Sequence, residues 1–192
     1  MRLPIQRVLK NGIAVEVDKM RSDEQEPVRS LLNQIVLAGI TYPQSQPLSE
    51  PEFAAYWLSR DAFVVRRAGA SSTNLPYDTP KPSPPEVLGA FYLKPNFPGR
   101  SGHICNAGFI VQPTMQGLGL GRLMAEAMLA IAPTQGYTAV MFNLVFATNT
   151  PSLNLWKSLG FSTIGRIPKA AHLATGETVD AIMLYYVFDD LA

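Results

Sequence analysis

A long helix that begins at a glycine-rich turn lies between two apolar segments, and this arrangement constrains the fold more than any other part of the sequence. Apolar residues recur at helical spacing from Leu120 to Ile131, and Pro133 closes the helix. The flanking segments 103–113 and 139–148 are short, apolar and rich in branched and aromatic residues, as buried strands are. Such a strand–helix–strand unit predicts two parallel strands joined by a right-handed crossover.

The rest of the chain predicts an α+β fold with a mixed sheet, built mostly from neighbours in sequence. The helix after the second apolar strand should begin with Thr150 as its N-cap and Pro151 at its first position. The Pro/Ser-rich segment 69–86 is expected to be an exposed loop within a single domain, residues 1–192, although a domain linker is the alternative. The other predicted strands are 12–19, 62–68, 86–95, 161–167 and 181–188, and the other predicted helices are 22–39 and 49–60.

Composition excludes several classes of function. A chain of 192 residues with a net charge of +1 has no electrostatic feature that would attract a nucleic acid. No apolar run approaches the length of a transmembrane helix, so no membrane partner is expected. One cysteine and two histidines cannot build a metal cluster, so no metal is expected. We therefore expect a soluble, cytoplasmic protein.

Two asparagines stand in the middle of the apolar strands that flank the central helix. Asn106 lies in "HICNAGFIV" and Asn143 in "AVMFNLVFATN". A buried carboxamide without partners costs about 1–3 kcal/mol, so each side chain needs something to bind. Either the two side chains bind a ligand, or each satisfies backbone groups at a bulge.

The glycine-rich segment "QGLGLGRL" at the start of the central helix predicts an anion site. Gly117, Gly119 and Gly121 alternate where the chain enters the helix, and the first N–H groups of a helix have no partner within it. Bare backbone donors at this place suit a phosphate or pyrophosphate. The alternative is a glycine-rich turn that lets the helix pack closely on the sheet. Neither a P-loop nor a dinucleotide-binding fingerprint fits the spacing.

The pattern Gln-x-x-Gly-x-Gly, met by Gln116, Gly119 and Gly121, resembles the acyl-CoA pyrophosphate loop of the GNAT N-acetyltransferases. "NTPSLNLWKSLGF" resembles the next helix of that superfamily. The segments "TYPQ", "FAAYW", "GAFYLKPN", "CNAGFIV" and "FNLVFATN" are further similar to the fungal acetyltransferases that act on L-azetidine-2-carboxylate and other proline analogues. The resemblance implies acetyl-CoA as cosubstrate, and a mixed twisted sheet that splays between two central parallel strands and is flanked by about four helices.

The resemblance also implies roles for particular residues. Asn106 and Asn143 would flank the gap between the splayed strands, hydrogen-bond the carboxylate and nitrogen of the substrate, and so position the amine for catalysis. Phe109 would pack on the substrate ring. Backbone groups of Phe109 and Val111 would pair with the pantetheine arm as an added strand does. The implied residues of the acetyl-CoA site are Phe109, Val111, Gln116, Gly117, Gly119, Gly121, Arg122, Asn149 and Trp156.

One position departs from the superfamily pattern. Trp156 stands where a tyrosine is usual, a residue proposed to protonate the leaving thiolate, and an indole N–H cannot deliver a proton near neutral pH. A thiol with a pKa of about 8.5 is, however, a fair leaving group already. We expect the amine proton to pass to water, because alternation along the strand places His103 on the face opposite Asn106. Cys105 is expected to lie in the core.

The predicted function is direct acetyl transfer from acetyl-CoA to a small amino or cyclic imino acid, a small-molecule amine substrate. Two alternatives remain open. A general GNAT enzyme would acetylate other small amines, polyamines or peptide N-termini. A non-catalytic acyl-CoA sensor would explain why Trp156 replaces the usual acid. The resemblance also implies a possible homodimer.

Overall fold

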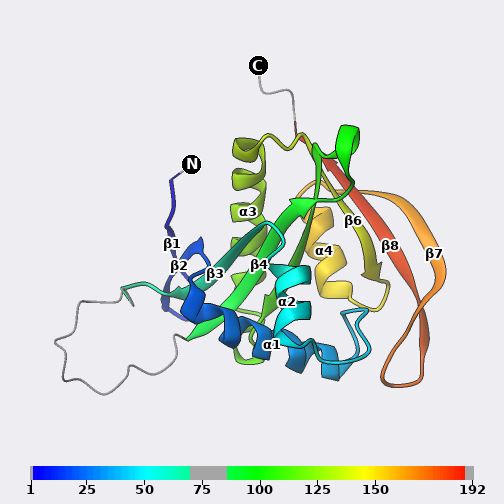
Figure 1. Ribbon diagram of the computed structural model, residues 1–192, viewed down its shortest axis with the longest axis horizontal. Helices are drawn as coiled ribbons and strands as arrows, with labels where there is room; N and C mark the ends of the chain where they lie inside the picture. The colour runs from blue at the N-terminus through cyan, green and yellow to red at the C-terminus, as the bar shows by residue number, and fades with distance from the viewer. Residues whose placement is uncertain (1, 70–85, 189–192) are drawn as a thin grey trace.

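The computed structural model describes residues 2–69 and 86–188, whose strands form one mixed sheet (Figure 1). The order across the sheet is β1-β2-β3-β4-β5-β6-β8-β7. The strands are β1 (Ile5–Val8), β2 (Ala14–Lys19), β3 (Asp61–Arg67), β4 (Val87–Pro95), β5 (Ile104–Val111), β6 (Ala139–Phe146), β7 (Ser162–His172) and β8 (Thr178–Val187). The α-helices of the described residues are α1 (Gln25–Ala38), α2 (Glu50–Trp57), α3 (Leu120–Ile131) and α4 (Thr150–Ser158).

The strand–helix–strand unit at the centre of the sequence is confirmed. β5, α3 and β6 follow one another, and β5 pairs with β6 in parallel. Every other pairing in the sheet is antiparallel. The sheet therefore has the predicted pair of central parallel strands, with four antiparallel strands leading up to β5 and two following β6.

The helices cover both faces of the sheet. α1 and α2 bury their apolar residues, among them Leu32 and Trp57, against one face of β3, β4 and β5. α3 and α4 cover the other face, where Met124 and Trp156 pack with Phe91 and Phe142 of the strands. Burial of these apolar surfaces on both sides of the sheet is the main term that stabilises the fold.

The predicted helix starts and ends are confirmed to within a few residues. Ser49 and Glu52 form the capping box expected at the start of α2, and Gly39 ends α1 in the left-handed conformation. The predicted start of α1 is instead a short 3-10 helix, η1 (Ser22–Glu24). The N-cap of α4 is Asn149 rather than Thr150, because the side chain of Asn149 accepts the Ser152 N–H at 3.3 Å.

Two strands differ from the prediction by more than three residues, and the bounds of the others shift by three residues or fewer. β1 was not predicted; it is short, has one buried residue, and is fixed by pairing with β2. β7 runs well past its predicted end at residue 167, through Pro168 to His172. Proline is tolerated there because β7 is an edge strand. Of the predicted loop 69–86, residues 70–85 lie outside the described part of the chain.

β7 and β8 form a long curved hairpin along one side of the molecule (Figure 1). Its tip contacts the end of α1, where the Ala174 N–H donates to the Gly39 carbonyl at 3.0 Å. A Cβ added to Gly39 would lie 2.4 Å from the Ala174 Cβ, so only glycine permits this approach. The hairpin tip is thereby fixed beside the segment that joins α1 to α2.

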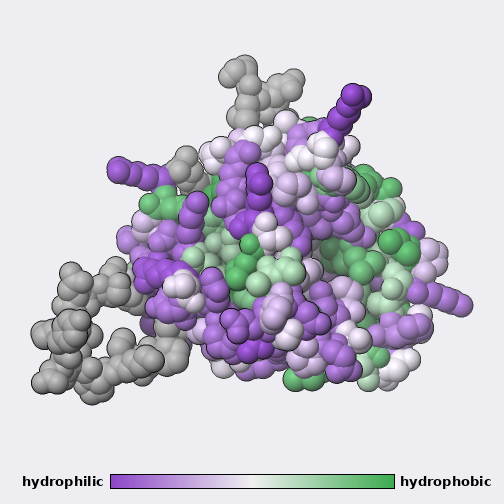
Figure 2. Space-filling view, viewed as in Figure 1, coloured by the Kyte–Doolittle hydropathy of each residue, from purple (hydrophilic) through white to green (hydrophobic). Residues whose placement is uncertain are grey.

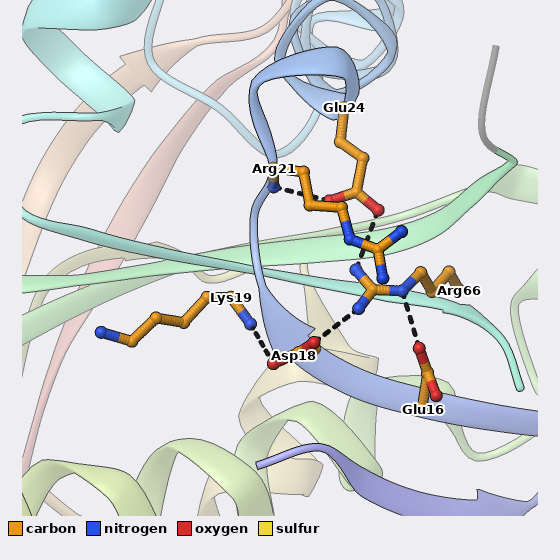
Figure 3. Close-up of polar contacts among 6 residues, drawn as sticks. All are labelled: Glu16, Asp18, Lys19, Arg21, Glu24 and Arg66. Carbon is orange, nitrogen blue, oxygen red and sulfur yellow. Dashed lines mark hydrogen bonds and ion pairs between the residues drawn. The ribbon is translucent and has the colours of Figure 1, made fainter. Parts of the chain in front are cut away.

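An ion cluster lies between β2, β3 and the start of α1 (Figure 3). Arg66, only 1% exposed, donates to Glu16 at 2.8 Å, to Glu24 at 2.9 Å and to Asp18 at 2.6 Å. Glu24 also accepts the backbone N–H of Arg21 at 2.7 Å. The guanidinium thus ties three segments of the chain together.

The surface of the face shown in Figure 2 is largely hydrophilic, with hydrophobic residues gathered near its middle and towards the β7–β8 hairpin. Across the described residues, the exposed large hydrophobic side chains include Leu37, Ile40, Ile164 and Ile167. None of the helices that the structure describes is both long and apolar enough to cross a bilayer.

Candidate active site

The central parallel strands separate soon after they meet. β5 and β6 pair only at Ile104–Ala139 and Cys105–Val140. Beyond this point β6 stays with β8, and an irregularity between Phe142 and Val145 places two residues of β6 opposite one residue of β8. A cleft of about 1620 Å³ opens here and is lined from both strands. Asn106 is the first residue of β5 beyond the last pair, so the gap begins at the first asparagine.

A third asparagine joins the two that the sequence singled out. Asn96, directly after β4, accepts at its Oδ1 from Asn143 Nδ2 at 2.6 Å and from Asn106 Nδ2 at 3.2 Å. Asn96 Nδ2 in turn donates to Asn143 Oδ1 at 3.0 Å. We call Asn96, Asn106 and Asn143 the amide cluster. Sequence analysis missed Asn96, which follows a strand and lies 47 residues before Asn143.

The amide cluster keeps hydrogen-bonding capacity for a ligand. Each carboxamide has two N–H donors and an oxygen that accepts two bonds. Asn106 Oδ1 has no partner among the described residues, and each Nδ2 of the cluster uses one of its two hydrogens. All three residues are partly buried and line the cleft. The alternative was that Asn106 and Asn143 only satisfy backbone groups at bulges. Their side chains bond instead to the side chain of Asn96.

The two faces of β5 serve opposite sides of the cleft. Asn106 lies across from Lys94 of β4, whereas Phe109 lies across from Phe91, three residues further along and therefore on the other face. The Phe109 ring stacks on Phe91, with centroids 5.4 Å apart, and lies 5.0 Å from Trp156. The predicted contact between Phe109 and a substrate ring stays a prediction, since the ring is on the α3–α4 side and Asn106 is on the α1–α2 side.

Backbone groups of β5 form a free edge in the gap. The Gln112 N–H donates to the Leu88 carbonyl, which makes Val111 and Gly89 a pair without mutual hydrogen bonds. By alternation, the N–H and C=O groups of Phe109 and Val111 point away from β4, towards the place that β6 has left. An extended chain can pair with this edge as an added strand, as the sequence analysis expects of a pantetheine arm.

The Phe109 carbonyl already has one partner. The Tyr42 hydroxyl, from the segment between α1 and α2, donates to it at 3.1 Å. Desolvation raises the pKa of Tyr42 well above its ordinary value, so this hydroxyl stays protonated and acts as a donor. A carbonyl oxygen accepts two hydrogen bonds, so the Phe109 carbonyl can accept a ligand N–H beside that of Tyr42.

The glycine-rich turn is open at the start of α3. Gly119 is the N-cap of α3 with φ +94°, and Gly117 has φ +75°, a conformation that L side chains rarely adopt. A Cβ on either would meet nothing within 4 Å. Backbone conformation and not close packing therefore requires these glycines, which favours the anion site over the packing alternative. Gln116 and Gly121 line the same part of the cleft.

Arg122 also lines the cleft, but its guanidinium has protein partners. It donates to the Ser158 hydroxyl of α4 at 2.7 Å and lies 3.6 Å from Glu126 one turn along α3. Arg122 therefore links the start of α3 to the end of α4, the two helices that wall this part of the cleft. Its predicted contact with acetyl-CoA stays a prediction.

Trp156 and Asn149 lie at the far wall of the gap. The indole N–H of Trp156 donates to the Ser152 hydroxyl at 3.0 Å, and its ring is buried against Phe142 and Phe161. Asn149 caps the same helix through Ser152. The indole therefore has a hydrogen-bond partner within its own helix, and the expectation that Trp156 delivers no proton stays a prediction.

Two further side chains were weighed as chemical groups. His103 is exposed, precedes β5 and does not line the cleft. Cys105 is fully buried, its Sγ donates to the Ala139 carbonyl at 3.3 Å, and burial raises the pKa of its thiol to about 12. A thiol so shielded is a poor nucleophile, so Cys105 belongs to the core as expected.

The α1–α2 side of the cleft holds aromatic and charged residues to which the sequence analysis gave no role. Tyr56, Tyr92 and Lys94 line it together. The hydroxyls of Tyr56 and Tyr92 are 3.4 Å apart, and burial raises the pKa of Tyr92. The residues described hold no group of three or more His, Cys, Asp or Glu side chains placed to bind a metal ion.

Comparison with known proteins identifies the family. Residues 43–161 match the acetyltransferase (GNAT) family, and because this stretch is more than half of the chain, the protein belongs to that family. The predicted superfamily and fold are confirmed.

Individual relatives agree. The N-acetyltransferase aca1 of Schizosaccharomyces pombe is 49% identical over 106 residues, which are 55% of this chain and 51% of aca1. The match thus spans about half the length of that relative. The structure of a GCN5-related N-acetyltransferase from Kribbella flavida superposes with a TM-score of 0.78 at 27% identity, over 91% of this chain and 98% of that one. The structure of yncA from Salmonella typhimurium, solved with its cofactor acetyl-CoA, shares the fold with a TM-score of 0.74 at 17% identity, over 93% of this chain and 96% of that one.

Every residue predicted for the site lines the one cleft between β5 and β6, from Asn106 and Asn143 at the gap to the glycine-rich turn. The roles given to them individually remain predictions. What the sequence did not indicate is the third amide, Asn96, and the contact of Tyr42 with the edge of β5.

Proposed function

We propose that this protein is an acetyl-CoA-dependent N-acetyltransferase that transfers the acetyl group directly to the amine of a small amino or cyclic imino acid. The observation that carries the proposal is the amide cluster at the mouth of the gap between β5 and β6. Family membership supports the reaction. The sequence segments that resemble acetyltransferases of proline analogues support the substrate class.

The residues of the cleft suit acetyl-CoA. The bare N–H groups at the start of α3, after Gly117 and Gly119, suit a pyrophosphate. The free edge of β5 at Phe109 and Val111 suits the amide groups of a pantetheine arm. When bound, acetyl-CoA supplies an acetyl thioester. The gap between the strands leads from this edge to Asn106, so both ligands can meet there.

The amide cluster would position the amine. Asn106 Oδ1 can accept an N–H of the substrate, and the second hydrogen of Asn143 Nδ2 can bind its carboxylate. The substrate ammonium first loses one proton to water, and the neutral amine forms a C–N bond with the acetyl carbon. The C–S bond breaks with release of the CoA thiolate, and the proton that remains on the nitrogen of a cyclic imino acid passes to water. The cleft provides orientation, which in well-aligned reactions contributes about 7–11 kcal/mol.

No covalent intermediate on the protein is proposed. Cys105 is buried with a pKa raised to about 12 and points its Sγ at the Ala139 carbonyl. A polyamine substrate is also disfavoured, because Glu177 is the one acidic residue among those that line the described cleft. A cationic substrate of several charges would find a single carboxylate there.

Thiol release from acetyl-CoA tests the proposal. L-azetidine-2-carboxylate, hydroxyproline isomers, proline, spermidine and a short peptide are offered in parallel. Release with the ring imino acids alone supports the proposed function. Release only with another amine keeps acetyl transfer and overturns the substrate class. If CoA binds tightly but no amine causes thiol release, the proposed enzymatic activity is overturned. That result would indicate a non-catalytic acyl-CoA-binding protein.

A further inference from the structure

Lys94 is the charged residue of the cleft that lies beside the amide cluster. It stands opposite Asn106 in the ladder between β4 and β5. The Asn96 N–H donates to the Ile104 carbonyl, which makes Asn96 and Ile104 a hydrogen-bonded pair. Because such pairs recur at every second position of an antiparallel ladder, Lys94 and Asn106 also form a hydrogen-bonded pair. Directly opposed residues in an antiparallel ladder project from the same face. The two side chains therefore start about 5.5 Å apart on the α1–α2 side of the sheet.

The ammonium group of Lys94 is held in place by aromatic rings. Its Nζ lies 4.6 Å from the centroid of Tyr56 and 4.5 Å from that of Tyr92, and it donates to the Tyr56 carbonyl at 2.8 Å. Tyr92 fits over the sheet because its opposite residue is Gly108, where a Cβ would lie 2.4 Å from the ring. Rings at this distance attract a cation and fix its position.

The ammonium group has no acidic partner in the described residues. An ammonium has three donors, and only the bond to the Tyr56 carbonyl is formed. The ion pairs of the described chain do not include Lys94, whereas Arg122 of the same cleft lies near Glu126. Partial burial also lowers the pKa of Lys94. A half-buried cation with spare donors and no counter-ion favours an anionic ligand.

We propose that Lys94 binds the carboxylate of the substrate and so makes the enzyme selective for amines that carry a carboxylate next to the reacting nitrogen. This inference rests on the proposed function and deepens it, because it names the residue that selects the substrate class. Asn106 would take the N–H and Lys94 the neighbouring carboxylate, from adjacent positions on one face. The second carboxylate oxygen remains for Asn143.

Paired substrates test the selectivity. L-azetidine-2-carboxylate, cis-4-hydroxy-L-proline and L-proline are each compared with the corresponding carboxamide, in the wild type and in Lys94→Met, which keeps most of the stem. We expect the wild type to prefer the acids by about 10-fold or more, as a hydrogen bond to a charged group implies. Lys94→Met should lose about this factor with the acids and less than about 3-fold with the amides. Lys94→Arg should recover part of the preference.

A purely structural role for Lys94 predicts a different pattern. Loss of packing would lower kcat/KM for acids and amides equally, and that result, or a wild type without preference, overturns the inference. Acetyl-CoA affinity serves as a control and should stay within about 2-fold in Lys94→Met.

Failure of the proposed function can be distinguished from failure of the Lys94 proposal. If no probe is acetylated, that function is lost, and calorimetric titration of the same acids and amides into the CoA-loaded protein decides on Lys94. Tighter binding of the acids that disappears in Lys94→Met would support the carboxylate site. Equal binding of acids and amides, or binding of neither, would overturn it.

Discussion

Two polar clusters in this molecule are built on opposite principles. Arg66 and its three carboxylates are charged, and Arg66, Glu16 and Glu24 are almost completely buried. The amide cluster is neutral, partly buried and open to the cleft. Each guanidinium nitrogen of Arg66 donates to a different carboxylate, whereas Asn106 Oδ1 and one hydrogen of each amide in the described cluster have no protein partner.

The difference shows what each cluster can contribute. Buried charges cost several kcal/mol each unless their partners are close, so the Arg66 cluster is stable only while it is complete. It joins β2, β3 and η1, and burial of Arg66, Glu16 and Glu24 keeps these groups away from a ligand. Neutral amides cost far less to leave partly unpaired at a water-filled cleft. The amide cluster can therefore exchange water for substrate, and the ion cluster cannot.

The largest expected effect is on stability, in Arg66→Met. The variant leaves Glu16 and Glu24 buried without their cation, and breaking a buried ion pair in this way costs about 3–5 kcal/mol. For a protein of this size we expect Tm to fall by about 10 °C. Thermal unfolding followed by circular dichroism measures it.

Arg67→Met is the matched control, since Arg67 is the next residue and pairs with Glu86 at 2.7 Å on the exposed surface. Its loss should lie within about 1 kcal/mol. Equal losses in the two variants would show that burial of the Arg66 cluster does not decide its contribution.

The next effect is on catalysis, in Asn143→Ala. Loss of the amide that binds the carboxylate should raise KM for the amine or lower kcat/KM by about 10-fold or more, because a hydrogen bond to a charged group contributes about 1.5–3 kcal/mol. Acetyl-CoA binding should survive, and the free energy of unfolding should change by about 1 kcal/mol or less. Steady-state kinetics and denaturant unfolding measure the two quantities.

Asn11→Ala serves as the control, because Asn11 is an exposed turn residue whose side chain accepts the Ile13 N–H. Unchanged kinetics in Asn143→Ala would remove the role proposed for Asn143. A large loss of stability would place the amide cluster with the ion cluster, as a structural element.

Much of the fold could be predicted from local pattern, and the exceptions have physical causes. The central unit β5–α3–β6, the glycine-rich turn and α2 follow from periodicity, φ > 0 positions and capping, which neighbours in sequence determine. β1 could not be predicted, because a short strand with one buried residue exists only through its pairing with β2. The second half of β7 was not predicted because it contains Pro168, and proline is unfavourable in most strands. It is tolerated here because β7 is at the edge of the sheet, which the sequence does not reveal.

The site divides in the same way. Asn106 and Asn143 were found because a polar residue interrupts an apolar strand. Asn96 follows a strand and precedes a turn, where asparagine is ordinary, so nothing local distinguishes it. Only the tertiary fold brings it to Asn143. The face of β5 on which Phe109 lies was predictable from its odd spacing to Asn106, yet which helices cover each face was not.

The smallest expected effect, in Asn96→Ala, decides whether the amide cluster acts as a unit. Asn96 binds Asn143 through both its Nδ2 and Oδ1 and contacts no proposed ligand, so it is a positioning residue. Its loss should lower kcat/KM by about 3–10-fold, mainly through KM for the amine, and leave KM for acetyl-CoA within about 2-fold. Asn96 holds Asn143 through two bonds and Asn106 through one longer bond of 3.2 Å, so the double variant should lose clearly less than the product of the two single losses. If the losses in kcat/KM of Asn96→Ala and Asn143→Ala multiply in the double variant, the two side chains act independently. Each amide of the cluster would then need a ligand contact of its own.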